Sequence, residues 1–147
     1  MTRIERDIII NAPVGKVFSF MDAVEKQPEW LPSMIEVRDI ANWPGLGTRW
    51  RWVFKMAGVR FEGESLVTEY LQNKKIVVET KGGIVSVWTW LFRPHRGATK
   101  VYLTIEYEVP GGVLGRLADR FLVEKMNQRE AEAALANIKS MVESGIV

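Results

Sequence analysis

The sequence predicts an α+β domain in which a curved antiparallel sheet packs one face against a long C-terminal helix. Apolar residues alternate with polar ones in several runs of the first hundred residues, as in strands with one buried face. From Gly112 to about Ser144, apolar residues instead recur three and four apart, the spacing of a helix face. The predicted order is a strand, short helices, about six antiparallel strands and the long helix, which places the helices on one face of the sheet.

Composition favours one soluble globular domain over residues 1–147 and excludes several classes of function. The net charge is only +2, with basic and acidic residues mixed along the chain, so we expect no nucleic-acid partner. The chain has no cysteine, which excludes disulfides and thiolate chemistry. No apolar run is long enough for a transmembrane segment, and the charged N-terminus lacks a secretion signal, so we expect a cytoplasmic location.

The first part of the chain predicts one strand, then short helices, then a second strand. The first strand covers Arg3 to Ile10 and ends at a turn. Pro13 in a first-turn position then begins a short helix. Two further prolines break the next segment, whose Trp30 is expected to close a cavity entrance or to anchor the short helices. The second strand is expected from Met34 to Ile40.

A hairpin gives the clearest pattern in the chain. From Thr48 to Met56, apolar and polar residues alternate strictly, and Ala57-Gly58 forms a two-residue turn. This turn predicts the following pairs on the inner face: Met56 with Val59, Phe54 with Phe61, Trp52 with Gly63, and Trp50 with Ser65. On the outer face, which also carries Val53, Arg51 meets Glu64. Gly63 leaves room beside the indole ring of Trp52.

The next hairpin has a register that the sequence leaves open. Its strands are expected at Lys75–Lys81 and Ile84–Phe92, around Gly82-Gly83. A two-residue loop pairs Trp88 with Val77, and a three-residue loop pairs it with Ile76. The size of Trp88 and Trp90 favours an inward position for both. The last strand, Lys100 to Val109, alternates with its inner face formed by Val101, Leu103, Ile105, Tyr107 and Val109.

The long helix carries one apolar stripe with a polar centre. The stripe comprises Leu114, Leu117, Phe121, Ala131, Leu135, Ile138 and Val142. Glu124 and Gln128 fall on the same face, so we expect them to look into a cavity. Alternatively, Glu124 lies at an edge and pairs with Lys125, Arg120 or Arg51. The segment from Val113 to Val123 is apolar nearly all round, which favours a lid or a homodimer contact over a membrane-touching patch.

Several segments spread along the chain carry a family resemblance: APVGKVFSFM followed by PEWLP, the glycine loop before TRWRW, the strand ending in FRP, the GATKV turn, and YEVPGGVLGRLADR. Their order and spacing together resemble the START-related superfamily. The resemblance covers nearly the whole chain and is greatest to the polyketide cyclase/dehydrase-like branch, beside the birch-pollen-allergen-like proteins. It implies the helix-grip fold, in which a seven-stranded sheet wraps the C-terminal helix around an apolar cavity.

These observations favour binding or transport of a small hydrophobic ligand: a lipid, a polyketide-like aromatic compound or an isoprenoid. The candidate ligand-binding residues are Trp50, Trp52, Phe54, Phe61, Trp90, Tyr107, Leu117, Phe121, Glu124 and Gln128. The aromatic members of this set suit a cavity lining and a filled core equally well.

Catalysis is a second hypothesis for the same cavity. His95 is the single histidine and lies in a basic turn, so neither a metal site nor a histidine-dependent triad is expected, and no cofactor is implied. A cyclase/aromatase or dehydratase would have to use a cavity carboxylate, for which Glu124 is the candidate. A third alternative, a ligand-free regulatory or co-chaperone module, predicts a filled core.

Overall fold

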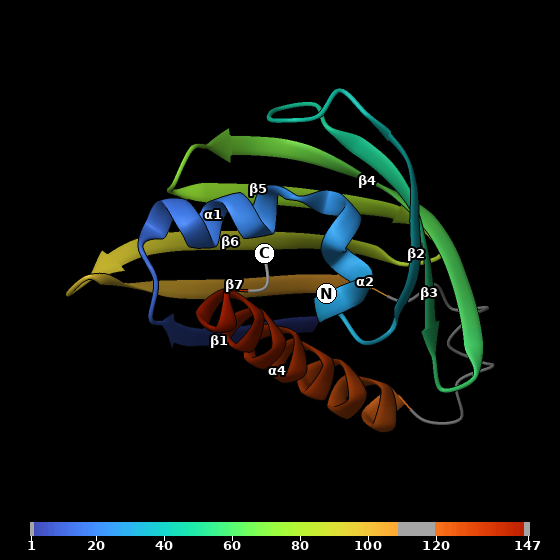
Figure 1. Ribbon diagram of the computed structural model, residues 1–147. Helices are drawn as coiled ribbons and strands as arrows, with labels where there is room; N and C mark the ends of the chain where they lie inside the picture. The colour runs from blue at the N-terminus through green and yellow to red at the C-terminus, as the bar shows by residue number, and fades with distance from the viewer. Residues whose placement is uncertain (1, 109–119, 146–147) are drawn as a thin grey trace.

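The computed structural model describes residues 2–108 and 120–145 of the chain (Figure 1). Within these ranges the elements are, in order, β1 (Thr2–Ile10), α1 (Val14–Asp22), the 3₁₀ turn η1 (Val24–Lys26), α2 (Gln27–Trp30), β2 (Met34–Ala41), β3 (Arg49–Met56), β4 (Val59–Leu71), β5 (Lys75–Gly82), β6 (Val85–His95), β7 (Ala98–Glu108) and α4 (Arg120–Ser144). The predicted order of elements is confirmed. Pro13 is the residue before α1 rather than part of its first turn.

The seven strands form one antiparallel sheet in the order β1-β7-β6-β5-β4-β3-β2. The sheet curves, and α1, α2 and α4 all lie on its concave side (Figure 1). Helix α4 packs mainly against β1 and also contacts α1 and α2. This is the helix-grip arrangement, so the predicted fold class is confirmed.

The β3–β4 hairpin has the predicted register. Trp50 pairs with Ser65, Trp52 with Gly63, and Arg51 with Glu64 on the opposite face. A Cβ atom added at Gly63 would collide with the Trp52 ring and with the carbonyl oxygen of Lys81, so the indole occupies the space that glycine leaves. Although Val53 lies on the outer face with the charged residues, it is fully buried, between Glu36 of β2 and Glu62 of β4 in the register.

The β5–β6 register differs from both predicted alternatives. Trp88 pairs with Val78, and Trp90 pairs with Ile76. The reason lies in the turn: β5 continues along β4 as far as Gly82, and its pairing with β6 stops at Thr80. The Thr80 hydroxyl there donates to the Ile84 carbonyl oxygen over 2.9 Å, which closes a longer turn than the two glycines suggest.

The C-terminal half of the predicted helix stripe is confirmed, whereas the described residues before Ala131 depart from it. Ala131, Leu135, Ile138 and Val142 are all buried. Two further buried positions of α4 are Val123 and Ala134. The predicted helix start and its residues Leu114 and Leu117 lie outside the described residues.

Phe121 and Gln128 correct the prediction that both belong to the buried stripe. Phe121 is 74% exposed, and Gln128 is exposed as well. A helical period of 3.6 residues allows a step of either three or four residues back from Ala131. The protein takes the step of four, to Asn127 and then to Val123, which turns Gln128 toward solvent.

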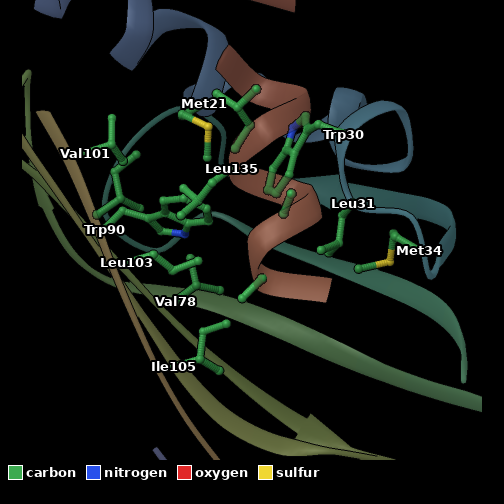
Figure 2. Close-up of a cluster of buried hydrophobic side chains, with 14 of the residues drawn as sticks. Met21, Trp30, Leu31, Met34, Val78, Trp90, Val101, Leu103, Ile105 and Leu135 are labelled. Atoms are coloured by element: carbon green, nitrogen blue, oxygen red, sulfur yellow. The ribbon is translucent and has the colours of Figure 1, made fainter. Parts of the chain in front are cut away.

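The core lies between the concave face of the sheet and the three helices. Figure 2 shows its side chains converging from three directions. Val78, Trp90, Leu103 and Ile105 come from the sheet, Trp30 and Leu31 from the α2 region, and Leu135 from α4.

Candidate ligand cavity

A cavity of about 90 Å³ lies between the concave face of the sheet on one side and α2 and α4 on the other. From α4 it is lined by Asn127, Glu130 and Ala131, and the strands β3 to β7 supply most of the remaining wall. Its volume is several times the roughly 10–15 Å³ that one water molecule requires. It is smaller than the roughly 300–1,000 Å³ of pockets that enclose drug-sized ligands. As it stands, the cavity therefore suits a group of about one ring, and a larger ligand has to displace lining side chains.

Five tryptophans line this cavity: Trp30, Trp50, Trp52, Trp88 and Trp90. The Trp30 ring meets Trp90 edge to face, with centroids 5.7 Å apart and planes at 88°. Trp88 stacks on Trp90, with centroids 6.2 Å apart and planes at 28°. These rings hold each other in place, since each such pair contributes about 0.5–1.5 kcal/mol beyond simple burial. The wall is consequently a pre-formed aromatic surface.

Four polar atoms of the wall are buried without a hydrogen-bond partner among the described residues. They are the indole Nε1 of Trp30, Trp50 and Trp52, and the hydroxyl of Tyr107. All four residues line the cavity, and none of them is more than 6% exposed. An unpaired buried donor destabilises the folded state by about 1–3 kcal/mol. A ligand that supplies acceptors and makes room beside these atoms removes that penalty.

Trp88 also lines the cavity, but its indole N–H is paired. Its Nε1 donates to the Ser86 hydroxyl over 3.1 Å, and the Ser86 oxygen in turn shares a short hydrogen bond with Thr80. Both hydroxyl residues also line the cavity. The unpaired donors therefore come from α2, β3 and β7, whereas the indole of Trp88 on β6 is already satisfied.

Glu130 places a carboxylate at the cavity. Its Oε2 accepts a hydrogen bond from the Ser33 backbone N–H at 2.7 Å, and its Oε1 accepts one from the Ser33 hydroxyl at 2.8 Å. Desolvation by burial raises the pKa of the Glu130 carboxyl above its ordinary value, and the two Ser33 bonds partly oppose that rise. The residue thus joins α4 to the segment before β2 and also gives the cavity a titratable group.

The structure brings half of the predicted ligand-binding residues together. Trp50, Trp52, Phe54, Trp90 and Tyr107 all line the cavity. Their role in binding stays a prediction.

The other half of the predicted set lies elsewhere. Phe61 is buried in the core but does not line the cavity, and Leu117 lies outside the described residues. Phe121 and Gln128 face solvent for the reason given above, and Glu124 is partly buried away from the lining. The lid and homodimer roles predicted for the start of the helix also stay predictions.

The sequence reasoning missed Glu130, Asn127 and Trp30 as lining residues. Glu130 carries a signal in its spacing, because it lies one helical turn before the buried Ala134. Its partner Ser33 is 97 positions away, so the bond that holds it could not be inferred locally. Trp30 belongs to the inner wall as well as to the short helices.

A second cavity of about 30 Å³ shares the walls of Trp30, Trp50 and Trp90 with the first. Here the Tyr70 hydroxyl donates to the Asp22 carboxylate over 2.9 Å. Burial, together with this bond to a carboxylate, raises the pKa of Tyr70 to about 12. Burial also raises the pKa of Asp22, against the lowering effect of the Tyr70 bond.

Two absences hold for the described ranges, 2–108 and 120–145. No helix there is long and apolar enough to cross a membrane. Nor does any cluster of three or more histidine, aspartate or glutamate side chains in this part of the chain have the arrangement of a metal site. His95 is exposed at the end of β6.

The curved sheet, the long helix and the cavity between them define the class of helix-grip proteins. Residues 1–143 match the family model described as polyketide cyclase/dehydrase and lipid transport, and the chain belongs to that family. This confirms the START-related resemblance. A search of curated proteins found no match.

Solved structures share the fold at low sequence identity. TTHA0849 from Thermus thermophilus is 24% identical, with a TM-score of 0.83 over 98% of this chain and 99% of its own. The Zhui aromatase/cyclase from Streptomyces sp. R1128 is 14% identical, with a TM-score of 0.81 over 99% and 96%. Ara h 8.0201 is 14% identical, with a TM-score of 0.71 over 97% and 98%.

Proposed function

We propose that this protein binds and carries a small hydrophobic ligand in the cavity between its sheet and α4. The observation that carries this proposal is the tryptophan-lined cavity, which the core leaves unfilled at the centre of the fold. Membership of a family described by both polyketide chemistry and lipid transport supports it. A ligand-free module predicts a filled interior, so the cavity counts against that alternative.

Apolar burial supplies most of the affinity in this proposal. Each square ångström of apolar surface removed from water stabilises the complex by roughly 25 cal/mol. Tryptophan rings that are already held by Trp30–Trp90 and Trp88–Trp90 packing lose little freedom when a ligand enters. A planar aromatic ligand or a compact isoprenoid fits such a wall better than a long flexible chain does.

Native mass spectrometry of gently purified protein tests the proposal, with cavity-filling and control variants alongside. Ala131 lines the cavity, so Ala131→Leu reduces its volume, whereas Ala136→Leu makes the same change on the exposed face of α4. We expect a co-purifying apolar compound on the natural protein and on the Ala136 variant, and its loss from the Ala131 variant. Equal loading of all three proteins would place the compound elsewhere and contradict the proposal.

A cofactor-independent cyclase or dehydratase is the second candidate, and Glu130 is the observation in its favour. A partly buried carboxyl whose pKa is raised above its ordinary value is a type of group that general acid–base catalysis uses. Both of its oxygens, however, accept bonds from Ser33, and those bonds favour the ionised form and a structural role. We therefore rank binding first.

The two candidates differ in their response to Glu130→Gln. A catalytic role predicts loss of turnover of a poly-β-ketone substrate by a factor of about 10²–10⁴, the usual contribution of general acid–base catalysis, with ligand binding retained. A carrier predicts no turnover in either protein.

A further inference from the structure

We infer that the ligand is electrically neutral and presents hydrogen-bond acceptors, such as carbonyl or ether oxygens, to the unpaired donors of the cavity wall. This inference rests on the proposed function and narrows it to one ligand chemistry. It is carried by two independent features of the cavity: the kind of polar atom left unpaired, and the sign of the charge at its lining.

The unpaired atoms select acceptors. Indole Nε1 can only donate a hydrogen bond, and three such groups, on Trp30, Trp50 and Trp52, are buried without a partner among the described residues. The hydroxyl of Tyr107 adds a fourth donor that can also accept. A pure hydrocarbon leaves all four unpaired, whereas a ketone, ester or quinone oxygen pairs with one or two of them.

The lining also disfavours a ligand anion. Glu130 is the only aspartate or glutamate among the described lining residues, and these include no lysine, arginine or histidine. A bound carboxylate would therefore share a poorly solvated space with Glu130 and would lack a cation to compensate it. Fatty acids and other free carboxylates are thus disfavoured relative to neutral esters, ketones and quinones.

A ligand reaches the unpaired donors only by enlarging the cavity. The four polar atoms are closed off even from water, around a space suited to about one ring. A ligand that parts the wall therefore gains room and reaches the donors in the same movement. A hydrocarbon of equal size has to part the same wall without forming any of these bonds.

Three probes with one ring in common test the inference: ethylbenzene, methyl benzoate and benzoate, titrated at neutral pH into ¹⁵N-labelled protein. The six indole N–H resonances, assigned by single Trp→Phe variants, report the hydrogen bonds directly. We expect methyl benzoate to move one or more of the Trp30, Trp50 and Trp52 resonances downfield. Trp43 provides an internal control, because its Nε1 atom already donates to the Asp22 carbonyl oxygen and it does not line this cavity.

The expected affinities fall in the order methyl benzoate, ethylbenzene, benzoate, with at least a fivefold preference for the ester over the hydrocarbon. Tyr107→Phe reduces that preference, and Tyr102→Phe on the opposite face of β7 leaves it unchanged. Glu130→Gln strengthens benzoate binding several-fold and has little effect on ethylbenzene.

The outcomes separate this inference from the proposed function. Equal affinities for all three probes, or tightest binding of benzoate, would overturn the inference and leave a general apolar carrier. If the ester binds best without moving any of the three indole resonances, the assigned donors are wrong and the inference fails. Absence of binding by every probe and by the co-purifying compound would overturn both.

Discussion

Two tyrosine hydroxyls of this protein lie in opposite hydrogen-bonding situations, and each makes a prediction about stability. Tyr70 donates to Asp22, whereas the buried Tyr107 hydroxyl has no partner among the described residues. Removing a paired hydroxyl loses about 1 kcal/mol, but removing an unpaired buried one also removes its desolvation penalty. We expect Tyr70→Phe to lower the free energy of unfolding by about 1 kcal/mol and Tyr107→Phe to leave it unchanged or raise it.

Urea denaturation of the ligand-free proteins measures both effects under the same conditions. If Tyr107→Phe lowers the free energy of unfolding as much as Tyr70→Phe does, the Tyr107 hydroxyl is paired in solution. The cavity then holds an acceptor that the wall itself supplies.

The Glu130 carboxyl predicts a defined pH dependence. Its pKa in the folded protein is raised above the ordinary value of 4.5, so the folded state binds this proton more tightly than the unfolded state does. Stability from this group is therefore fully present below pH 4.5 and is lost as pH rises through the folded pKa. We expect Glu130→Gln to abolish that decrease.

The measurement is the difference between the natural protein and the Gln variant in free energy of unfolding across that pH range. A difference is needed because other carboxyls titrate nearby: Asp22 has a raised pKa, and the backbone N–H of Asn11 lowers that of Glu143. If the natural protein instead gains stability relative to the Gln variant as pH rises, the Ser33 bonds lower the pKa of Glu130 more than burial raises it.

At the scale of elements, the packing of Trp52 across Gly63 ties the β3–β4 hairpin to the cavity. A Cβ at residue 63 would meet both the indole ring and the backbone of β5 at Lys81, and the backbone cannot move aside easily. We expect Gly63→Ala to destabilise the protein by about 1–3 kcal/mol, as overpacking does, and to weaken ligand binding by displacing Trp52. Gly15→Ala in α1 is the control, because its Cβ meets nothing within 4 Å.

Thermal unfolding of the two alanine variants compares them directly. The control is expected to be neutral or stabilised by up to about 1 kcal/mol, since alanine favours a helix more than glycine does. Equal stability of the two variants would mean that β4 can move away from the Trp52 ring at no cost in stability.

Helix α4 holds the segment around Trp30 through two side chains, two helical turns apart on one face. Glu130 accepts two bonds from Ser33, and the Asn137 side chain donates to the Trp30 carbonyl oxygen over 3.1 Å. Together they position the Trp30 ring over the cavity. We expect Asn137→Ala to lower the free energy of unfolding by about 1 kcal/mol and to accelerate amide hydrogen exchange in α2. Unchanged exchange there would show that the Glu130–Ser33 bonds and the packing of Trp30 on Trp90 hold the segment without Asn137.

The two hairpins show why one register could be predicted and the other could not. Between Met56 and Val59 only two residues are available, so the turn determines every pair of β3 and β4. Between Thr80 and Ser86 the chain has several ways to turn. The one adopted depends on the Thr80 hydroxyl and on the pairing of Gly82 with β4, neither of which shows in an alternation pattern.

The residues of the candidate site likewise fall into those that the sequence predicted and those that it did not. Trp50, Trp52, Phe54 and Tyr107 were predictable because a strand's period of two assigns each side chain to one face. On α4 the apolar spacing predicted Ala131, Leu135 and Ile138 but left the next turn uncertain by one position. For that reason Glu124, rather than Glu130, was predicted as the cavity carboxylate. The bond that holds Glu130 comes from Ser33, in a distant part of the chain, so local spacing did not reveal it.

At the scale of the whole molecule, the cavity exists only while the sheet, α2 and α4 are assembled around it. A ligand that occupies it therefore binds the folded state alone and raises the stability of the entire fold. At a free concentration of 100 times Kd, the free energy of unfolding increases by about 2.7 kcal/mol. For a chain of 147 residues, that increase corresponds to a rise in Tm of roughly 5–10 °C.

We expect methyl benzoate to raise the Tm of the natural protein in this concentration-dependent way. Ala131→Leu is expected to lose the dependence, because its longer side chain enters the space the ligand needs, whereas Ala136→Leu retains it. Differential scanning calorimetry with and without the ester measures all three proteins. A ligand-induced rise that survives in the Ala131 variant would place the stabilising site outside the cavity. Ala131, Glu130 and Asn137 all lie on α4. The comparison therefore also tests whether this helix forms a wall of the ligand site in addition to packing against the sheet.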